Sequence, residues 1–260
     1  MMIEASALTV RAGTATLVDG VSLSVRGGEV LAIAGPNGAG KSTLLSALSG
    51  DLTPSSGTVE LGGEALPALR GRRLALRRAV LPQRVELAFP FTAAEVVHMG
   101  RAPHPPGDDD EVVGRCMAET DTFHLADRAY PTLSGGEQAR VSLARVLAQD
   151  TPILMLDEPT AALDLRHQEQ VLAVASARAE AGCAVVVVLH DLNLAAAYAH
   201  RVALLESGRL RACAPPDEVL RSDLLSEVYG HPVSVRRVGG DLVVLPQRAA
   251  ASGNRQVTEE

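Results

Sequence analysis

The sequence predicts an α/β fold in which a mainly helical segment interrupts a core built around a parallel sheet. Short apolar runs of strand length alternate with longer helical patterns over most of the chain, an order typical of doubly wound α/β cores. In the middle of the chain, helical patterns follow one another with no such run between them. The chain has 260 residues, 47% of them hydrophobic, which is enough to bury a sizeable core in one or two lobes.

The strand candidates are of two kinds. Residues 6–10 and 21–25 alternate, or nearly alternate, apolar and polar side chains, and Gly27 and Gly28 predict a turn after them. Later runs are continuously apolar, which is typical of strands covered on both faces, as in a parallel sheet. These runs are Val30–Ala34, 153–156, 184–189 and 202–205.

Helical patterns separate the apolar runs. In the core they are Lys41–Ser49, ended by Gly50, residues 166–181, ended by Gly182, and residues 191–199. In the middle they are residues 92–99 and 110–125, joined by the proline-rich loop 102–107, and residues 138–148.

One domain is therefore expected over residues 1–247. Its α/β core would span about 1–84 and 148–247, and its helical insertion about 85–147. Residues 248–260 are small and polar, so we expect a disordered tail there.

Composition excludes several classes of protein. The net charge is −7, and the only arginine-rich stretch, residues 70–78, predicts a solvated helix face, so a nucleic-acid partner is not expected. Cys116, Cys183 and Cys213 lack metal-ligand spacing, and a disulfide framework is not expected at this size. No signal peptide is predicted, and no apolar run approaches the roughly 18 residues of a membrane span, so a membrane role would require a partner.

A phosphate-binding loop is predicted after the first buried strand. The motif G-x-x-x-x-G-K-[ST] stands between that strand and a helical pattern, which is the context that supports it. Glycines allow successive N–H groups to face one anion, and the helix N-terminus adds favourable partial charge. The lysine would reach the β- and γ-phosphates, and the serine hydroxyl would bind Mg²⁺. The predicted nucleotide-binding residues are Gly35, Pro36, Asn37, Gly38, Ala39, Gly40, Lys41, Ser42 and Thr43.

Two adjacent carboxylates end the apolar run at residues 153–156. The carboxyl edge of a parallel sheet is where ligands of α/β proteins bind. Asp157 would therefore hold Mg²⁺, and Glu158 would orient and polarise the water that attacks the γ-phosphate.

A second anion-binding helix start is predicted at Ser134, Gly135, Gly136, Glu137 and Gln138. Two chains placed head to tail could each offer this segment to the other's nucleotide. Ser134 followed three residues later by Glu137 also fits a plain capping box, and both interpretations can hold, although a cap does not explain the two glycines.

In this order, the phosphate loop, the segment 133–138 and residues 153–160 resemble the ATP-binding cassette (ABC) ATPases, over about residues 7–230. The resemblance implies a P-loop NTPase core with an N-terminal antiparallel β subdomain and an inserted helical subdomain. It also implies a homodimer that hydrolyses ATP with Mg²⁺.

Three further site residues are carried over from the resemblance. Gln83 would sense Mg²⁺ and the attacking water and couple the site to a membrane subunit. Asp164 would lie in the loop that crosses the dimer interface, and His190 would contact the γ-phosphate. Residues 10–13 lack the aromatic that stacks on adenine in many family members, so Arg11 is an alternative base contact and discrimination against GTP is expected to be weak.

Residues 89–104 are similar to the helical lobe of bacterial importers for iron chelates, haem and cobalamin, and their ends look most like the haem branch. This similarity implies two transmembrane permease subunits, a periplasmic binding protein acting indirectly, and a peripheral location on the cytoplasmic face of the inner membrane. The alternatives are a siderophore or cobalamin importer, a soluble cassette ATPase of translation or DNA repair, and a soluble scaffold for metal-cluster assembly. Haem ligation by His98, His104, His124 or His167 is not expected, because the motor subunits of such importers do not hold the cargo.

Overall fold

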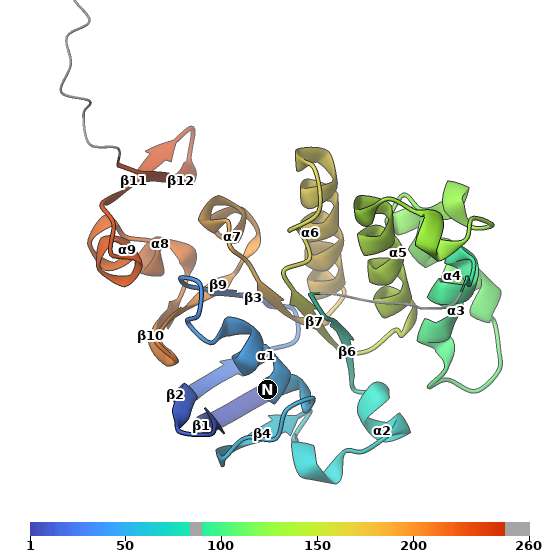
Figure 1. Cartoon of the computed structure of the whole chain (residues 1–260), viewed down its shortest axis with the longest axis horizontal. Coiled ribbons are helices and arrows are strands. Elements are labelled where there is room, and N and C mark those ends of the chain that lie inside the picture. The colour runs from blue at the N-terminus through green and yellow to red at the C-terminus, as the bar shows by residue number, and fades with distance from the viewer. Residues whose placement is uncertain (84–89, 248–260) are drawn as a thin grey trace, which may run out of the picture.

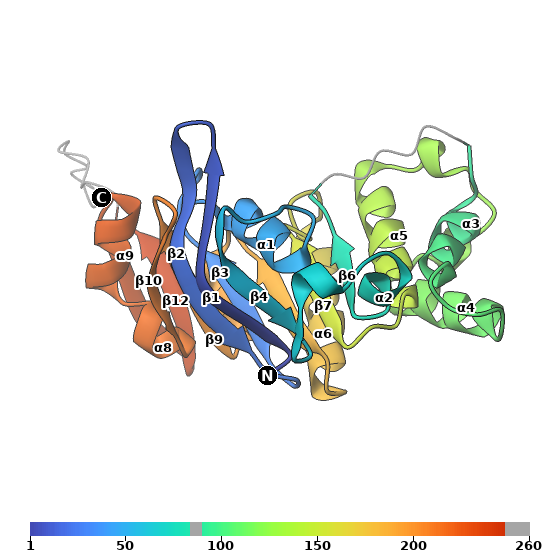
Figure 2. The same cartoon turned by 90° about the horizontal axis from the view of Figure 1, so that it is seen from below.

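The computed structural model describes residues 1–83 and 90–247. The expected start of the helical insertion near residue 85, the first residue of the segment 89–104 and the expected tail at 248–260 lie outside the described residues. Figures 1 and 2 show a central sheet, an N-terminal sheet beside it, and a helical segment and a C-terminal segment at opposite ends of the molecule.

The central sheet has six strands in the order β10-β9-β3-β8-β7-β6, and all neighbours are parallel except β9 and β10. Alternate residues of β3 belong to two separate hydrophobic clusters, Val30 to one and Leu31 to the other, so both faces of the strand are buried. This confirms the predicted parallel core. The strands are β3 (Val30–Ala34), β6 (Arg78–Leu81), β7 (Ile153–Asp157), β8 (Ala184–Val188), β9 (Arg201–Glu206) and β10 (Arg209–Ala214).

Helices cover both faces of this sheet. On one face, α1 (Lys41–Ser49) adds Leu44 and Leu48 to the cluster that contains Leu31. On the other face, α6 (Leu165–Glu180) and α7 (Leu192–Tyr198) pack with the cluster of Val30. Each of the three helices begins and ends within one residue of its prediction.

An antiparallel N-terminal sheet, in the order β2-β1-β4-β5, packs against the same face as α1. This sheet confirms the antiparallel β subdomain expected from the family resemblance. The first two strands are longer than predicted, and the short strands that follow α1 were not predicted. The strands are β1 (Ile3–Ala12), β2 (Ala15–Val25), β4 (Ser56–Leu61) and β5 (Glu64–Ala65).

The predicted helix face at residues 70–78 is wrong for most of its length. Within it only α2 (Arg72–Ala75) is helical, and Arg78 opens strand β6; η1 (Leu66–Ala68) precedes the segment. The Arg78 guanidinium donates to the Ser49 carbonyl at 2.8 Å and to Asp51 at 2.7 Å, so it joins the end of α1 to the sheet edge.

The middle of the chain is helical, as predicted, and α3 and α4 both pack on α5. The predicted single helix over residues 110–125 is wrong, because α4 ends at Glu119. Beyond it, the Thr120 hydroxyl bonds back to the Cys116 carbonyl and Asp121 adopts a φ of 52°, which a continuing helix does not allow. The elements are α3 (Ala93–His98), η2 (Met99–Arg101), α4 (Asp109–Glu119), η3 (Phe123–Leu125), η4 (Tyr130–Thr132) and α5 (Gly135–Ala148).

The C-terminal segment was not predicted. It consists of α8 (Pro216–Val219), α9 (Ser222–Tyr229) and a hairpin of β11 (Val233–Val238) and β12 (Asp241–Pro246). The hairpin forms a separate sheet, and β12 packs on α7 of the core. Within residues 1–83 and 90–247, no helix has the length and apolar character needed to span a membrane.

Candidate nucleotide-binding and hydrolysis site

The predicted phosphate loop connects β3 to α1 and requires glycine at both ends. Gly35 has a φ of 145°, and a Cβ there would lie 2.2 Å from the Leu205 carbonyl oxygen. Gly40 has a φ of 95°, and a Cβ there would lie 2.4 Å from the Leu17 carbonyl oxygen. Backbone packs closely against the loop from both sides, so only glycine fits these positions.

Lys41 is buried at the start of α1, and its Nζ donates to the carbonyl oxygens of Gly35 at 2.9 Å and Pro36 at 3.0 Å. Burial lowers the pKa of this lysine, whereas the nearby carboxylates of Glu158 and Asp157 act in the opposite direction. A cation held inside the loop by the loop's own carbonyls faces the position that a phosphate would take.

Asp157 ends β7 and accepts a hydrogen bond of 3.0 Å from the Ser42 hydroxyl at the start of α1. Burial raises the pKa of Asp157, and the hydrogen bond from Ser42 opposes that rise. A hydroxyl and a carboxylate that meet beside a phosphate loop are the oxygen donors that Mg²⁺ uses in such sites. The residues present therefore fit the predicted metal ion.

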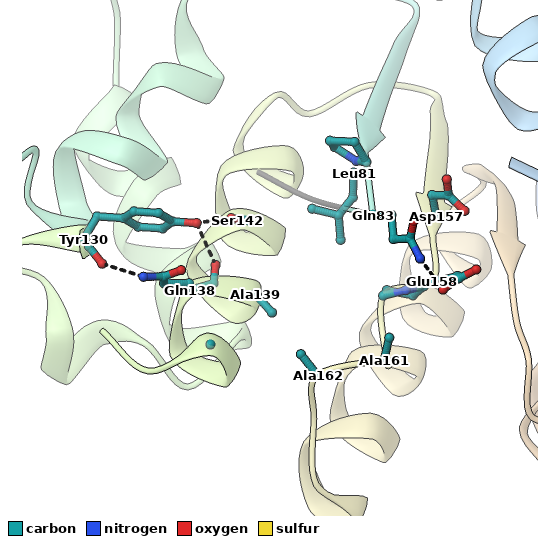
Figure 3. A pocket seen from close by; sticks show the side chains of 13 residues that line it. Leu81, Gln83, Tyr130, Gln138, Ala139, Ser142, Asp157, Glu158, Ala161 and Ala162 are labelled. Atoms are coloured by element: carbon teal, nitrogen blue, oxygen red, sulfur yellow. Dashed lines mark hydrogen bonds between the residues drawn. The ribbon is translucent and has the colours of Figure 1, made fainter. Parts of the chain in front are cut away.

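Two side chains, each at the end of a neighbouring strand of the sheet, contact the Glu158 carboxylate. Gln83, which follows β6, donates from Nε2 to Glu158 at 2.7 Å, and the ring of His190, which follows β8, pairs with the other carboxylate oxygen. Figure 3 shows Gln83 pointing at Glu158 beside Asp157. Glu158 has a φ of 51°, a conformation that is uncommon outside glycine and that clusters at functional sites.

The structure thus brings together Lys41, Ser42, Gln83, Asp157, Glu158 and His190, all predicted as site residues. The reason is topological, because the carboxyl ends of parallel strands meet at one edge of the sheet. Gln83 and His190 are far apart in the sequence, and each of them touches Glu158.

The segment Ser134 to Gln138 lies apart from the phosphate loop in the single chain. Among the described residues, no hydrogen bond joins the two. Ser134 caps α5 in a capping box with Glu137, so the plain structural interpretation of these two residues is confirmed. Gly135 and Gly136 fall inside the first turn of α5, three residues earlier than the predicted helix start.

A cavity of about 300 Å³ separates this segment from the carboxylates of Asp157 and Glu158. Gln83 and Glu158 line it from the core, and Tyr130, Gln138 and Ser142 line it from the helical segment (Figure 3). The two groups of predicted site residues therefore face one space without touching.

Asp164 caps α6 and accepts from the backbone N–H of His167 at 3.0 Å, and it pairs with that residue's ring at 2.7 Å. The bond from the His167 backbone is the main reason why the pKa of Asp164 is lowered. Arg140 in α5, which was not among the predicted site residues, is 7% exposed, and its Nε has no partner among the described residues. Its charge is the smallest of the effects that lower the pKa of Glu137 and of Asp164, after the hydrogen bonds from Ser134 and His167.

The four histidines considered as haem ligands have separate surroundings. His98 lies 3.9 Å from Asp110, His104 bonds to the Gln149 carbonyl at 2.8 Å, and His167 pairs with Asp164. His124 is exposed. Across the part of the chain that the structure describes, no group of three or more His, Cys, Asp or Glu residues could hold a metal ion.

Fold and site together define a nucleotide-hydrolysing cassette, and comparison with known proteins agrees: the chain belongs to the ABC transporter family, whose profile matches residues 18–161. The hemin import ATP-binding protein HmuV of Nocardia farcinica is 60% identical over 238 residues, which cover 89% of this chain and 83% of the relative.

Solved structures of the same family have the same fold. A metal-chelate type ABC transporter in an inward-facing conformation superposes with a TM-score of 0.81 at 25% identity, covering 95% of this chain and 98% of that one. A dimeric ATP-binding cassette bound to ADP and Pi after hydrolysis superposes with a TM-score of 0.75 at 28% identity, covering 83% and 99%.

Proposed function

We propose that this chain is the ATP-hydrolysing subunit of a bacterial haem importer, and that it works as a homodimer beneath two separate permease subunits. The convergence of Lys41, Asp157, Gln83 and His190 around Glu158 carries the hydrolytic part of the proposal. The 60% identity with a hemin import ATP-binding protein over 89% of the chain supports haem as the cargo.

The residues Gly35 to Thr43 would bind the triphosphate. Their backbone N–H groups lie at the start of α1, where the helix dipole favours an anion, and Lys41 supplies a positive charge from within the loop. Ser42, Asp157 and Gln83 would hold Mg²⁺, which neutralises charge on the β- and γ-phosphates when it is bound.

Glu158 would accept a proton from the attacking water or orient that water for in-line attack. Gln83 and His190 each contact one oxygen of its carboxylate, so they fix the direction in which the carboxylate points. In this arrangement His190 would also contact the γ-phosphate, and Gln83 would report the state of the site to the helical segment.

The residues Ser134 to Gln138 would act on the nucleotide of a second copy. The start of α5 carries the exposed Ser134 and Gly135, and in one chain a cavity separates it from the carboxylates. A head-to-tail pair would place this helix N-terminus against the other copy's triphosphate, with Asp164 near the interface. A solved cassette of similar fold is a dimer bound to ADP and Pi, which supports a dimeric arrangement for this chain.

The remaining partners follow from the transport role. A chain whose described residues contain no membrane-spanning helix would dock on two permease subunits at the cytoplasmic face of the inner membrane. A periplasmic binding protein would deliver the cargo to those permeases and would act on this chain only through them.

Reconstitution with the cognate permease in liposomes tests the proposal. ATPase activity should rise several-fold when the cognate binding protein carries haem, and the Glu158→Gln variant should show no such rise. Stimulation only by a ferric siderophore or by cobalamin would overturn haem as the cargo and leave the ATPase role intact. A wild-type complex that never hydrolyses ATP would overturn both.

A further inference from the structure

The side chain of Asn193 forms a paired contact with one peptide of the C-terminal hairpin. The backbone N–H of Val244 donates to Asn193 Oδ1 at 2.7 Å, and Asn193 Nδ2 donates to the Val244 carbonyl at 3.4 Å. Val244 faces Val235 of β11 in the hairpin register, so the amide of Asn193 bonds to the other edge of β12. One primary amide thus takes the place that a third strand would occupy.

The backbone of Asn193 is hydrogen-bonded to the side chain of Asp191, the residue that follows His190. Its N–H donates to the Asp191 carboxylate at 2.7 Å, and the Leu194 N–H approaches the same oxygen at 3.4 Å. Asp191 is the N-cap of α7, and the ring of His190 before it pairs with Glu158. A continuous set of contacts therefore leads from the hairpin to the catalytic carboxylate.

The helix between these contacts is short and needs external support. α7 has seven residues, fewer than an isolated helix needs to hold its shape. Leu194 and Ala195 anchor it to the core, and β12 packs against it, with Val244 only 8% exposed. Figures 1 and 2 show the hairpin at the end of the molecule opposite the helical insertion, so this support is independent of that insertion.

We propose that Asn193 is a positioning residue for His190: by bonding to the Val244 peptide, it fixes the first turn of α7 and so the place of the histidine beside Glu158. The proposal rests on the role given above to His190 in hydrolysis. It assigns a function to the C-terminal hairpin, whose β12 supplies a fixed support for the catalytic histidine.

Two variants of the full-length chain test this role. Asn193→Asp is nearly isosteric and can still accept from the Val244 N–H, but it places an oxygen against the Val244 carbonyl. Asn193→Ala removes both bonds. Each should lower kcat for ATP hydrolysis by about tenfold and change KM by less than about twofold, because the phosphate loop is untouched.

The matched control is Arg237→Ala, which alters the same hairpin. The Arg237 side chain donates to the Gly240 carbonyl at 3.1 Å and lies 3.8 Å from Asp217, and among the described residues it forms no hydrogen bond with Asn193. This variant should keep the wild-type kcat. Equal losses in the control and in the Asn193 variants would assign the effect to general loosening of the hairpin and would overturn the proposal.

A double-mutant cycle separates positioning from simple destabilisation. If Asn193 acts through His190, then Asn193→Asp should add little to the loss already caused by His190→Ala, whereas independent effects would multiply. Multiplying effects, or a wild-type kcat in Asn193→Asp, would refute the role of Asn193. A wild-type kcat in His190→Ala would instead refute the catalytic role of the histidine itself. Thermal unfolding of each variant checks that it is folded, and Asn193→Ser replaces the alanine variant if that one does not fold.

Discussion

At the scale of single residues, the site contains two charged side chains whose burial costs free energy. Asp157 and Lys41 are both buried. Burial raises the pKa of Asp157 and lowers the pKa of Lys41, so it favours the neutral form of each side chain. Each charge partly offsets the cost of burying the other, because opposite charges in the same site attract. If the two groups serve the proposed site, they do so at the expense of stability.

The Asp157→Asn variant should therefore unfold at a higher temperature than the wild type at neutral pH. The pKa of Asp157 is raised from 3.8, so its favourable contribution to folding is present below that ordinary value and is lost as the pH rises through the folded-state pKa. Asparagine does not ionise and can still accept from Ser42. We expect a gain on the order of 2 °C at pH 7.5, measured by calorimetry without nucleotide.

This gain should shrink as the pH falls toward 3.8, the ordinary pKa of an aspartate. Magnesium and ATP should reverse the order of stability, because Asp157 is a proposed metal ligand and the variant would bind the metal and the nucleotide less tightly. A variant that is less stable than the wild type at every pH would contradict the burial argument.

Residue identities were predictable where the chemistry is local in the sequence. The phosphate loop is one continuous motif, and Asp157 and Glu158 end an apolar strand directly. Gln83 and His190 required the family resemblance, because each stands alone in the sequence and meets Glu158 only through the sheet. The amide of Asn193 could not be assigned, since its partner is a backbone peptide 51 positions away.

At the scale of elements, continuity of the apolar run decided what could be predicted. The runs at β3, β7 and β8 are buried along their whole length and were predicted closely. β6 is a strand of four residues that opens with an arginine, and its alternating burial gives no continuous signal. The C-terminal hairpin carries apolar residues in both strands, but only Val233 and Val244 are buried, so its apolar pattern does not mark a strand of the core.

Two helices begin with the same capping motif, so the effect of losing the cap can be compared between a helix outside the proposed site and one within it. Thr92 with Glu95 at α3 and Ser134 with Glu137 at α5 both form complete capping boxes. Thr92→Ala and Ser134→Ala should each lower the free energy of unfolding by about 1 kcal/mol, because each leaves the first turn with an unpaired N–H. Urea unfolding monitored by circular dichroism measures this quantity.

ATP hydrolysis by the same two variants should differ. Ser134→Ala should lose activity at saturating ATP, because its hydroxyl would contact the nucleotide of the second copy, whereas Thr92→Ala should keep it. If the two variants lost activity equally, Ser134 would be only a helix cap and the proposed contact across the dimer would be wrong.

At the scale of the whole molecule, the proposed catalytic residues lie in two regions of the chain that face each other across a cavity. Lys41, Asp157 and Glu158 lie on the core, while Ser134 opens α5 on the helical segment across a cavity of about 300 Å³. Motifs predicted the residues of both regions, but no pattern in the sequence shows that a cavity keeps the two regions apart in the folded chain. In the proposed homodimer, the α5 of a second copy would complete the site.

Glu158→Gln should consequently form a stable dimer when it binds ATP and Mg²⁺. Glutamine keeps the shape of the side chain and the contact with Gln83, but it cannot accept a proton, so kcat should fall by at least about 100-fold. The γ-phosphate that would join the two copies then persists, and light scattering after size-exclusion chromatography should show doubled mass. Lys41→Ala is the control: it should bind ATP weakly, and its mass should not change on adding nucleotide. If Glu158→Gln stays monomeric with saturating ATP, both alone and on its permease, then ATP does not join two copies through Ser134, and α5 must act within its own chain.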